Sequence, residues 1–114
     1  MNTITCTTIR ELNFAKAATP VVIPTGTTIQ LYFKTEKPAR AYFMHNGIER
    51  PLSVSHLHLT VKSSSVKFRK APSLRAMEKA NDAGVMTTVT GAKVEPDGHD
   101  EYGAASWLLV MGLI

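Results

Sequence analysis

The cationic side chains between residues 62 and 79 are the ones whose spacing points most clearly to a function. Lysine and arginine recur at Lys62, Lys67, Arg69, Lys70, Arg75 and Lys79. Cations gathered along one surface neutralise the phosphates of nucleic acids and release their counterions. The spacing therefore predicts a phosphate-contacting stripe formed by these residues. An acidic partner protein could use the same stripe.

The charge of the chain differs between its two parts. Residues 1–70 carry ten Lys or Arg against three Glu, and residues 71–114 carry three against six Asp or Glu. The net charges are therefore +7 and −3, which together give the +4 of the whole chain. A basic body with a weakly acidic tail favours a polyanion or an acidic protein face as partner. Ordinary solubilising charge is the alternative interpretation.

Aromatic side chains in predicted strands offer a second way to contact nucleic acid. The rings of Tyr32, Tyr42 and Phe43 would stack on bases if they faced outward. Alternating strand positions more often point into a core, so a core position is the favoured interpretation.

Two groups of residues have the donor types of a metal site. His56 and His58 would share one face of a predicted strand over residues 56–61, with His45 or Cys6 to complete a site. The second group is acidic and runs over residues 95–101: Glu95, Asp97, Asp100 and Glu101, with His99 among them. We interpret the histidines as polar surface residues and the acidic group as a solvated turn, in which Asp97 bonds its own backbone. No metal and no other cofactor is predicted.

The sequence contains no motif for nucleophilic catalysis or for binding a nucleotide phosphate. It has no Gly-x-Ser-x-Gly elbow, and residues 90–93, Thr-Gly-Ala-Lys, lack the glycines and the Lys-Ser/Thr ending of a phosphate-binding loop. We therefore predict a binding protein and not an enzyme.

The stripe begins in a region that the sequence predicts to be mostly strand. Short strands are expected over residues 3–9, 28–33, 40–45, 48–52, 56–61 and 65–69. Asn46-Gly47 suits the positive φ angles of a type I′ hairpin turn between two of them. Short strands joined by tight turns favour an α+β, mostly β chain, in which residues 1–70 form a small antiparallel barrel of SH3-like or OB-like size.

Residues 71–114 are predicted to be an appendage packed against this barrel as one unit. A helix is expected over residues 73–84, with a Ser73 cap, a terminal Gly84 and Leu74, Met77 and Ala80 buried. A hairpin is expected next, from strands over residues 85–90 and 93–95.

The last segment, residues 106–114, is apolar nearly all round after its Ser106 cap. We expect a short helix there, with a terminal strand as the alternative. Such a segment should be buried in the core or in a homodimer.

Composition predicts a cytoplasmic protein that does not enter a membrane. The longest apolar run, residues 107–114, is far shorter than a membrane span, and the N-terminus lacks the pattern of a signal peptide. The single cysteine, Cys6, excludes an internal disulfide and suits a reducing compartment. It is expected to be a buried, inert thiol.

Residues 73–85, SLRAMEKANDAGV, with the hairpin after them, resemble the second helix and wing of MerR-type or excisionase-type winged helix-turn-helix modules. The first helix of that motif would precede Pro72, where this chain has a predicted strand instead. Residues 88–114 resemble the C-terminus of small uncharacterised proteins of bacteriophages and prophages. This second resemblance implies a mobile-element context and a bacterial host cell.

Our first hypothesis is a small phage or mobile-element protein that binds nucleic acid through its basic face. The alternative is an anti-CRISPR-like inhibitor that binds a host defence complex, including a nucleoprotein complex, through the same face. A structural phage component, assembled through the apolar C-terminus, is a third and minor interpretation.

Overall fold

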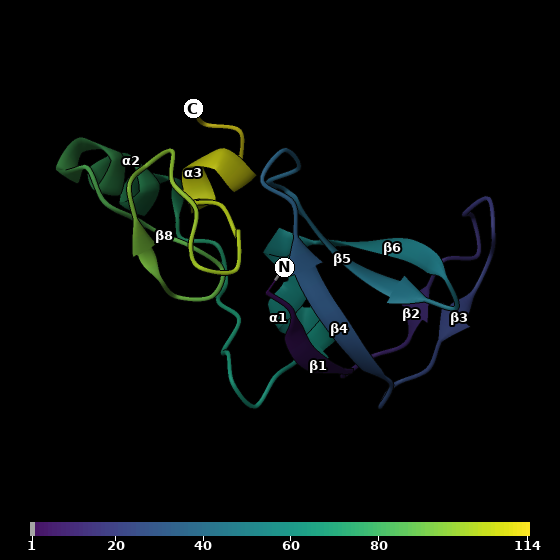
Figure 1. Ribbon diagram of the computed structural model, residues 1–114. Helices are drawn as coiled ribbons and strands as arrows, with labels where there is room; N and C mark the ends of the chain where they lie inside the picture. The colour runs from purple at the N-terminus through teal and green to yellow at the C-terminus, as the bar shows by residue number, and fades with distance from the viewer. Residues whose placement is uncertain (1) are drawn as a thin grey trace.

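Five antiparallel strands form the main sheet of the protein. The computed structural model describes residues 2–114 and contains the strands β1 (Ile4–Thr8), β4 (Thr28–Phe33), β5 (Arg40–His45), β6 (Ile48–Ser53) and β7 (Val61–Lys62). Their order across the sheet is β6-β5-β4-β1-β7 (Figure 1). Two further short strands, β2 (Leu12–Asn13) and β3 (Val22–Ile23), pair with each other at one end of the main sheet. The main sheet and this pair form the first of two lobes, called the sheet lobe.

The β5–β6 hairpin is formed as the sequence predicts. Asn46 and Gly47 have φ angles of 51° and 76°, the left-handed values that a type I′ turn requires. His45 pairs with Ile48, and the register continues to Arg40 opposite Ser53. The turn therefore sets which side chains of β5 and β6 share a face.

Alternation along the strands places the core on one face of the sheet. In β1, Ile4, Cys6 and Thr8 are buried and the residues between them are exposed. Cys6 is only 1% exposed, and its burial raises the thiol pKa to about 12. The thiol is therefore protonated and shielded at neutral pH, as predicted for an inert cysteine.

The sheet does not close into the predicted barrel, because β6 and β7 remain its two edges. The predicted strand over residues 56–61 is also wrong. These residues belong to the 3₁₀ turn η1 (Val54–His56), the helix α1 (Leu57–Thr60) and the two-residue β7. Val54, Leu57 and Val61 are each at most 2% exposed and recur at helical spacing, so burying them favours a helical turn. The mostly β, α+β class is confirmed, whereas an SH3-like or OB-like architecture is not.

The second lobe follows the predicted order of helix, hairpin and helix. It contains α2 (Leu74–Ala83), β8 (Met86–Thr87), β9 (Lys93–Val94) and α3 (Trp107–Val110). The Ser73 hydroxyl accepts from the Ala76 amide at 3.2 Å, and Gly84 ends α2 with a φ of 76°. Ser106 caps α3 by accepting from the Leu109 amide at 3.3 Å.

The predicted buried face of α2 is only partly correct. Met77 is buried and Ala80 half-buried, but Leu74 is 56% exposed. Figure 1 shows α2 at the outer end of the second lobe.

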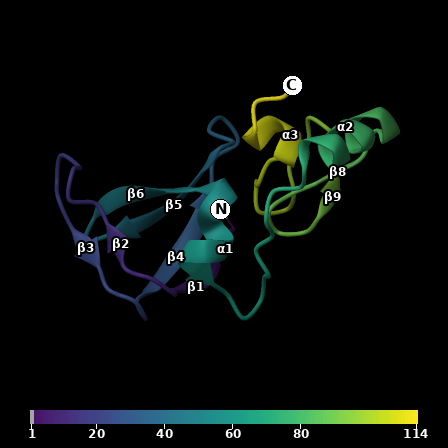
Figure 2. The same ribbon diagram turned by 180° about the vertical axis from the view of Figure 1, so that it is seen from behind.

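The two lobes share one hydrophobic cluster. Buried side chains from Ile4 to Val110 belong to it, including Phe43 of the sheet and Trp107 of α3. The side-chain amide of Asn2 also donates to the Glu101 carbonyl at 2.8 Å, which ties the start of the chain to the second lobe. Residues 63–73, called the linker below, join the lobes along one side (Figure 2). Within residues 2–114, every helix is too short or too polar to cross a membrane.

Candidate nucleic-acid interface

The linker is extended and alternates buried and exposed side chains. Val66 and Phe68 are buried, whereas Lys67, Arg69 and Lys70 are exposed. The predicted strand over residues 65–69 is not part of any sheet, but the Arg69 amide donates to the Val89 carbonyl at 2.8 Å. Extended backbone turns successive side chains to opposite sides, so the apolar residues anchor the linker and the cations face outward.

A hollow of about 380 Å³, called the linker hollow below, lies between the linker and the end of the sheet. Its apolar lining consists of Ile9, Val61, Val66 and Phe68. Its polar lining consists of His58, Lys62, Ser63 and Lys67. Two of the predicted cations, Lys62 and Lys67, therefore line a hollow that is largely apolar.

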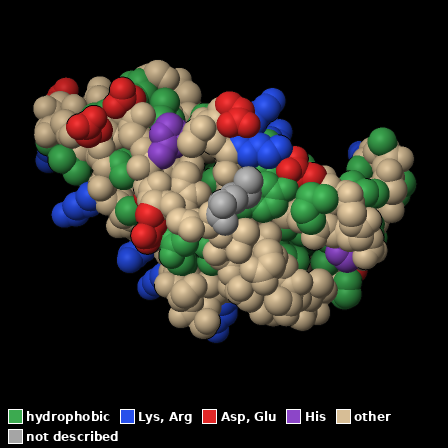
Figure 3. Space-filling view, in the orientation of Figure 1, with side chains coloured by type: hydrophobic (Ala, Val, Ile, Leu, Met, Phe, Trp, Pro, Cys, Tyr) green, Lys and Arg blue, Asp and Glu red, His purple; other side chains and the backbone are tan. Residues whose placement is uncertain are grey.

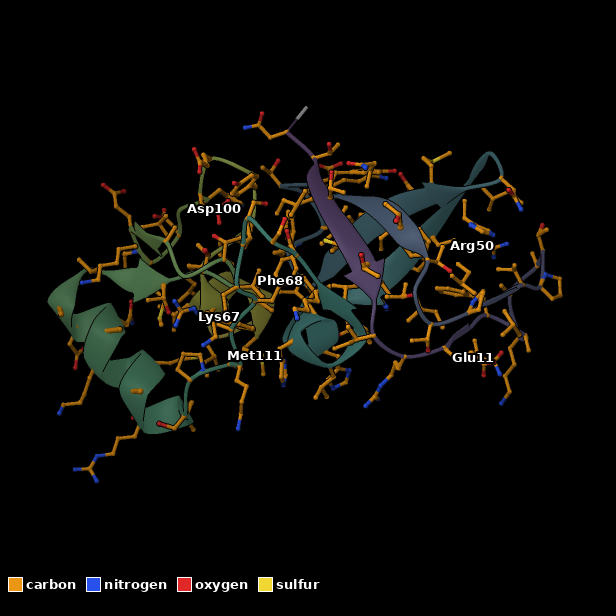
Figure 4. The ribbon with its side chains drawn as sticks, turned by 90° about the horizontal axis from the view of Figure 1, so that it is seen from below. Glu11, Arg50, Lys67, Phe68, Asp100 and Met111 are labelled. Atoms are coloured by element: carbon orange, nitrogen blue, oxygen red, sulfur yellow. The ribbon has the colours of Figure 1, made fainter. Side chains whose placement is uncertain are left out.

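A second hollow, of about 300 Å³, lies on the other side of Lys67. Lys67, Arg69 and Tyr102 are among its lining residues, with Ser65 and Thr90 supplying hydroxyls. Glu101 also lines it, so this hollow is less suited to phosphate than the linker hollow. Lys67 belongs to both and lies between the two lobes (Figure 4).

Gly91 makes room for the Arg69 side chain. A Cβ atom built on Gly91 would lie 3.2 Å from Arg69 Nε, and the glycine has a φ of +88°. Any other residue would therefore be strained and would push against Arg69.

The predicted cations are exposed, and none of them forms an ion pair within residues 2–114. The ion pair found within residues 2–114 joins Lys34 Nζ to Glu49 Oε1 at 2.6 Å, so it involves none of the predicted cations. The side chains left free are those of Lys62, Lys67, Arg69, Lys70, Arg75 and Lys79. Figure 3 shows Lys and Arg side chains projecting along the lower margin of the molecule, where the linker runs.

The structure brings only part of the predicted stripe together. Lys62, Lys67 and Arg69 line the two adjoining hollows, and Lys70 follows them in the linker. Arg75 and Lys79 lie on the exposed side of α2 and line neither hollow. Lys62 at the end of β7 and the linker cations Lys67, Arg69 and Lys70 therefore form the centre of the candidate interface.

The predicted face shared by His56 and His58 does not exist. Both residues lie in the η1–α1 turns, where positions two apart point in different directions. No group of three or more His, Cys, Asp or Glu within residues 2–114 is arranged to hold a metal ion. His58 instead lines the linker hollow. Its Nδ1 is buried and has no hydrogen-bond partner within residues 2–114.

Asp100 of the acidic group organises the loop around it. One carboxylate oxygen accepts from the Thr88 and Thr90 hydroxyls at 2.8 and 2.6 Å. The other accepts from the amides of Tyr102 and Ala104 at 2.9 and 3.0 Å. These bonds explain the position of the carboxylate without any cation.

The aromatic residues of the sheet divide between its two faces. Phe43 is fully buried in the core, as the favoured interpretation predicts. Tyr32 and Tyr42 stack on the opposite face with ring centroids 6.1 Å apart, and the Lys34 ammonium lies 4.3 Å from the centre of the Tyr42 ring. The Tyr32 hydroxyl donates to Glu49, which also accepts from Lys34 at 2.6 Å. These rings are already engaged within the chain, so they are less suited to stacking on bases.

The alkaline titration of Tyr32 should differ from that of an exposed tyrosine. Burial, with the hydrogen bond to Glu49 and its charge, raises the Tyr32 pKa from about 10 to about 12. Between about pH 10 and about pH 12, the folded protein therefore keeps the Tyr32 proton that the unfolded chain loses. The stability that Tyr32 contributes is present below about pH 10 and is lost as pH rises from about 10 to about 12.

In ultraviolet titration of phenolate absorbance, we expect Tyr32→Phe to remove the step near pH 12. Tyr42→Phe is the comparison on the same face. Persistence of the step near pH 12 in Tyr32→Phe would contradict this assignment.

Arg50 is a buried cation that sequence reasoning missed. It is only 5% exposed, and its Nε has no hydrogen-bond partner within residues 2–114. The guanidinium carbon lies 5.4 Å from the centre of the Phe14 ring, which provides a cation–π contact. Figure 4 shows Arg50 in the sheet lobe, away from Lys67, so it is no part of the candidate interface. It was missed because a charged side chain is expected to face solvent, whereas Arg50 shares the buried side of β6 with Leu52.

Comparisons with protein-family models, curated proteins and solved structures found no match to this chain.

Proposed function

We propose that this protein binds nucleic acid, without catalysing a reaction, through the exposed cations of its linker. The observation that carries the proposal is the position of Lys67, which lies in the wall shared by two hollows beside Lys62 and Arg69. The resemblances to winged-helix fragments and to phage proteins add a context: a mobile element acting in the cytoplasm of a bacterial host.

The exposure of these cations favours phosphate binding. A lysine or arginine that already pairs with a carboxylate must exchange one partner for another, whereas the linker cations have no such partner within residues 2–114. Each phosphate contact releases a counterion, so the free energy of binding comes largely from cations that are accessible and unpaired.

The α2 helix contributes less under this proposal. Arg75 and Lys79 are exposed, but Glu78 and Asp82 are exposed on the same helix and would repel phosphates. We therefore expect Arg75→Ala to weaken binding about equally across sequences, without altering sequence preference.

The dependence of affinity on salt provides the test. The slope of log affinity against log salt should be about −0.9 for each phosphate neutralised on duplex DNA and about −0.7 on single strands. Replacing Lys67, Arg69 and Lys70 by Ala should flatten that slope by about two to three, because each substitution removes roughly one phosphate contact. Fluorescence anisotropy with labelled oligonucleotides measures both quantities.

A matched variant controls for net charge. Lys16, Lys37 and Arg40 are exposed in the sheet lobe and line neither the linker hollow nor the second hollow. Replacing all three by Ala removes the same charge. This control should change the slope much less than the linker variant does.

Absence of binding to duplex or single strands at low salt would overturn the proposal. The anti-CRISPR-like alternative, a protein that inhibits a host defence complex, would then gain support from a pull-down that survives nuclease treatment.

A further inference from the structure

The linker hollow contains more apolar surface than phosphate binding needs. Phosphates bind to cations and amides at an open surface, yet this hollow is lined by Ile9, Val61, Val66 and Phe68 beneath its two lysines. Its volume of about 380 Å³ lies within the range of pockets that bind small ligands. The hollow therefore suits a flat, mostly apolar group attached to an anion.

The charges around the hollow indicate that the ligand also carries anionic groups. Lys62 and Lys67 line the hollow and are exposed, and neither pairs with a carboxylate within residues 2–114. A base in the hollow would bring its own phosphate and that of its neighbour towards these ammonium groups.

We propose that the linker hollow accepts one unstacked base of a single-stranded nucleic acid, with Lys62 and Lys67 on the adjoining phosphates. This inference rests on the proposed function and names its substrate class. In a duplex the base is paired and stacked, and removing it costs free energy, whereas single strands offer splayed bases. The protein therefore prefers single strands.

Two neighbouring serines provide a matched test of this pocket. Ser63 lines the hollow and Ser64 does not, and Ser64 is exposed. Ser63→Phe should fill the hollow and lower affinity for a labelled single-stranded 12-mer by about tenfold, within the range that a base contact contributes. Ser64→Phe should change it by less than about twofold. Ser63→Ala separates the loss of the hydroxyl from the filling of the hollow.

An oligonucleotide of abasic sites tests the role of the base directly. It keeps the phosphates, so the unmodified protein should bind it about tenfold more weakly than the normal 12-mer. Ser63→Phe should cause no further loss with this probe, nor with a duplex of the same length. Thermal melting of each variant confirms that it folds, and Ile9→Trp, from an exposed residue elsewhere in the wall, is a second way to fill the hollow.

The possible results separate this inference from the proposed function. If normal single strands, abasic strands and duplexes bind alike, depend on Lys67 and ignore Ser63→Phe, the base pocket is wrong but nucleic-acid binding stands. If none of the three probes binds, the proposed function fails as well. A host protein that competes for the hollow in place of nucleic acid would also overturn the inference.

Discussion

Trp107→Ala is expected to lower the free energy of unfolding by about 3–5 kcal/mol, as large aromatic truncations in cores do. Trp107 is fully buried at the start of α3, a helix of four residues that is too short to be stable alone. It belongs to the cluster that joins the two lobes. The expected loss is a large share of the roughly 5–15 kcal/mol that stabilises a small domain.

Chemical denaturation of the variant measures this loss, and two comparisons show whether it arises from the core. Trp107→Phe keeps part of the ring volume and should lose less stability. Leu113→Ala removes a side chain that is 44% exposed and should change stability little. A Trp107→Ala protein that melts within a degree or two of the parent would show that α3 does not anchor the second lobe.

The elements that the sequence predicted well have local causes. The β5–β6 hairpin follows from Asn46-Gly47, because few dipeptides adopt two positive φ angles so readily. Likewise, α2 (Leu74–Ala83) lies between its caps Ser73 and Gly84 because these caps satisfy backbone groups within one turn. Interactions between residues close in sequence are sufficient for these structures.

The errors concern interactions between distant residues. Whether a sheet closes depends on pairing between its first and last strands, and no local signal in β6 or β7 specifies it. Over residues 56–61 the local pattern predicts a strand, but burial of Val54, Leu57 and Val61 favours a helical turn. Tertiary packing thus overrode the local pattern.

The candidate interface was predictable in its charges but not in its shape. The run of cations between residues 62 and 79 indicates the interface, and the structure shows which of these cations come together: Lys67 and Arg69 are both exposed in the linker. The hollow beside them needs Ile9, which directly follows β1 and is distant in sequence. The spacing of Arg75 and Lys79 gave no sign that α2 would carry them away from the hollows.

Asp100→Ala is expected to lower the free energy of unfolding by about 2–4 kcal/mol, because it removes one acceptor group from several buried or half-buried donors. The carboxylate accepts from Thr88, Thr90, Tyr102 and Ala104, and Thr88 is fully buried. The Thr88 and Thr90 hydroxyls lie 3.0 Å apart and can bond each other, which recovers part of the loss. Within residues 2–114, the amides of Tyr102 and Ala104 have no second acceptor.

Asp97→Ala is the matched control for this change. Asp97 is exposed in the same loop, and the predicted bond to its own backbone is wrong, because its carboxylate accepts no hydrogen bond within residues 2–114. Denaturation of this variant should therefore show a change below about 0.5 kcal/mol. Equal stability of the two variants would show that the Asp100 network contributes nothing that water cannot replace.

The same substitution also connects the fold to the interface. Thr90 and Tyr102, both held by Asp100, line the second hollow beside Lys67 and Arg69. If the linker hollow is the main binding site, Asp100→Ala should weaken single-strand binding by only about twofold under conditions where the variant is folded, because the linker hollow contains neither residue. A loss of about tenfold in the folded variant would instead move the centre of binding to the second hollow.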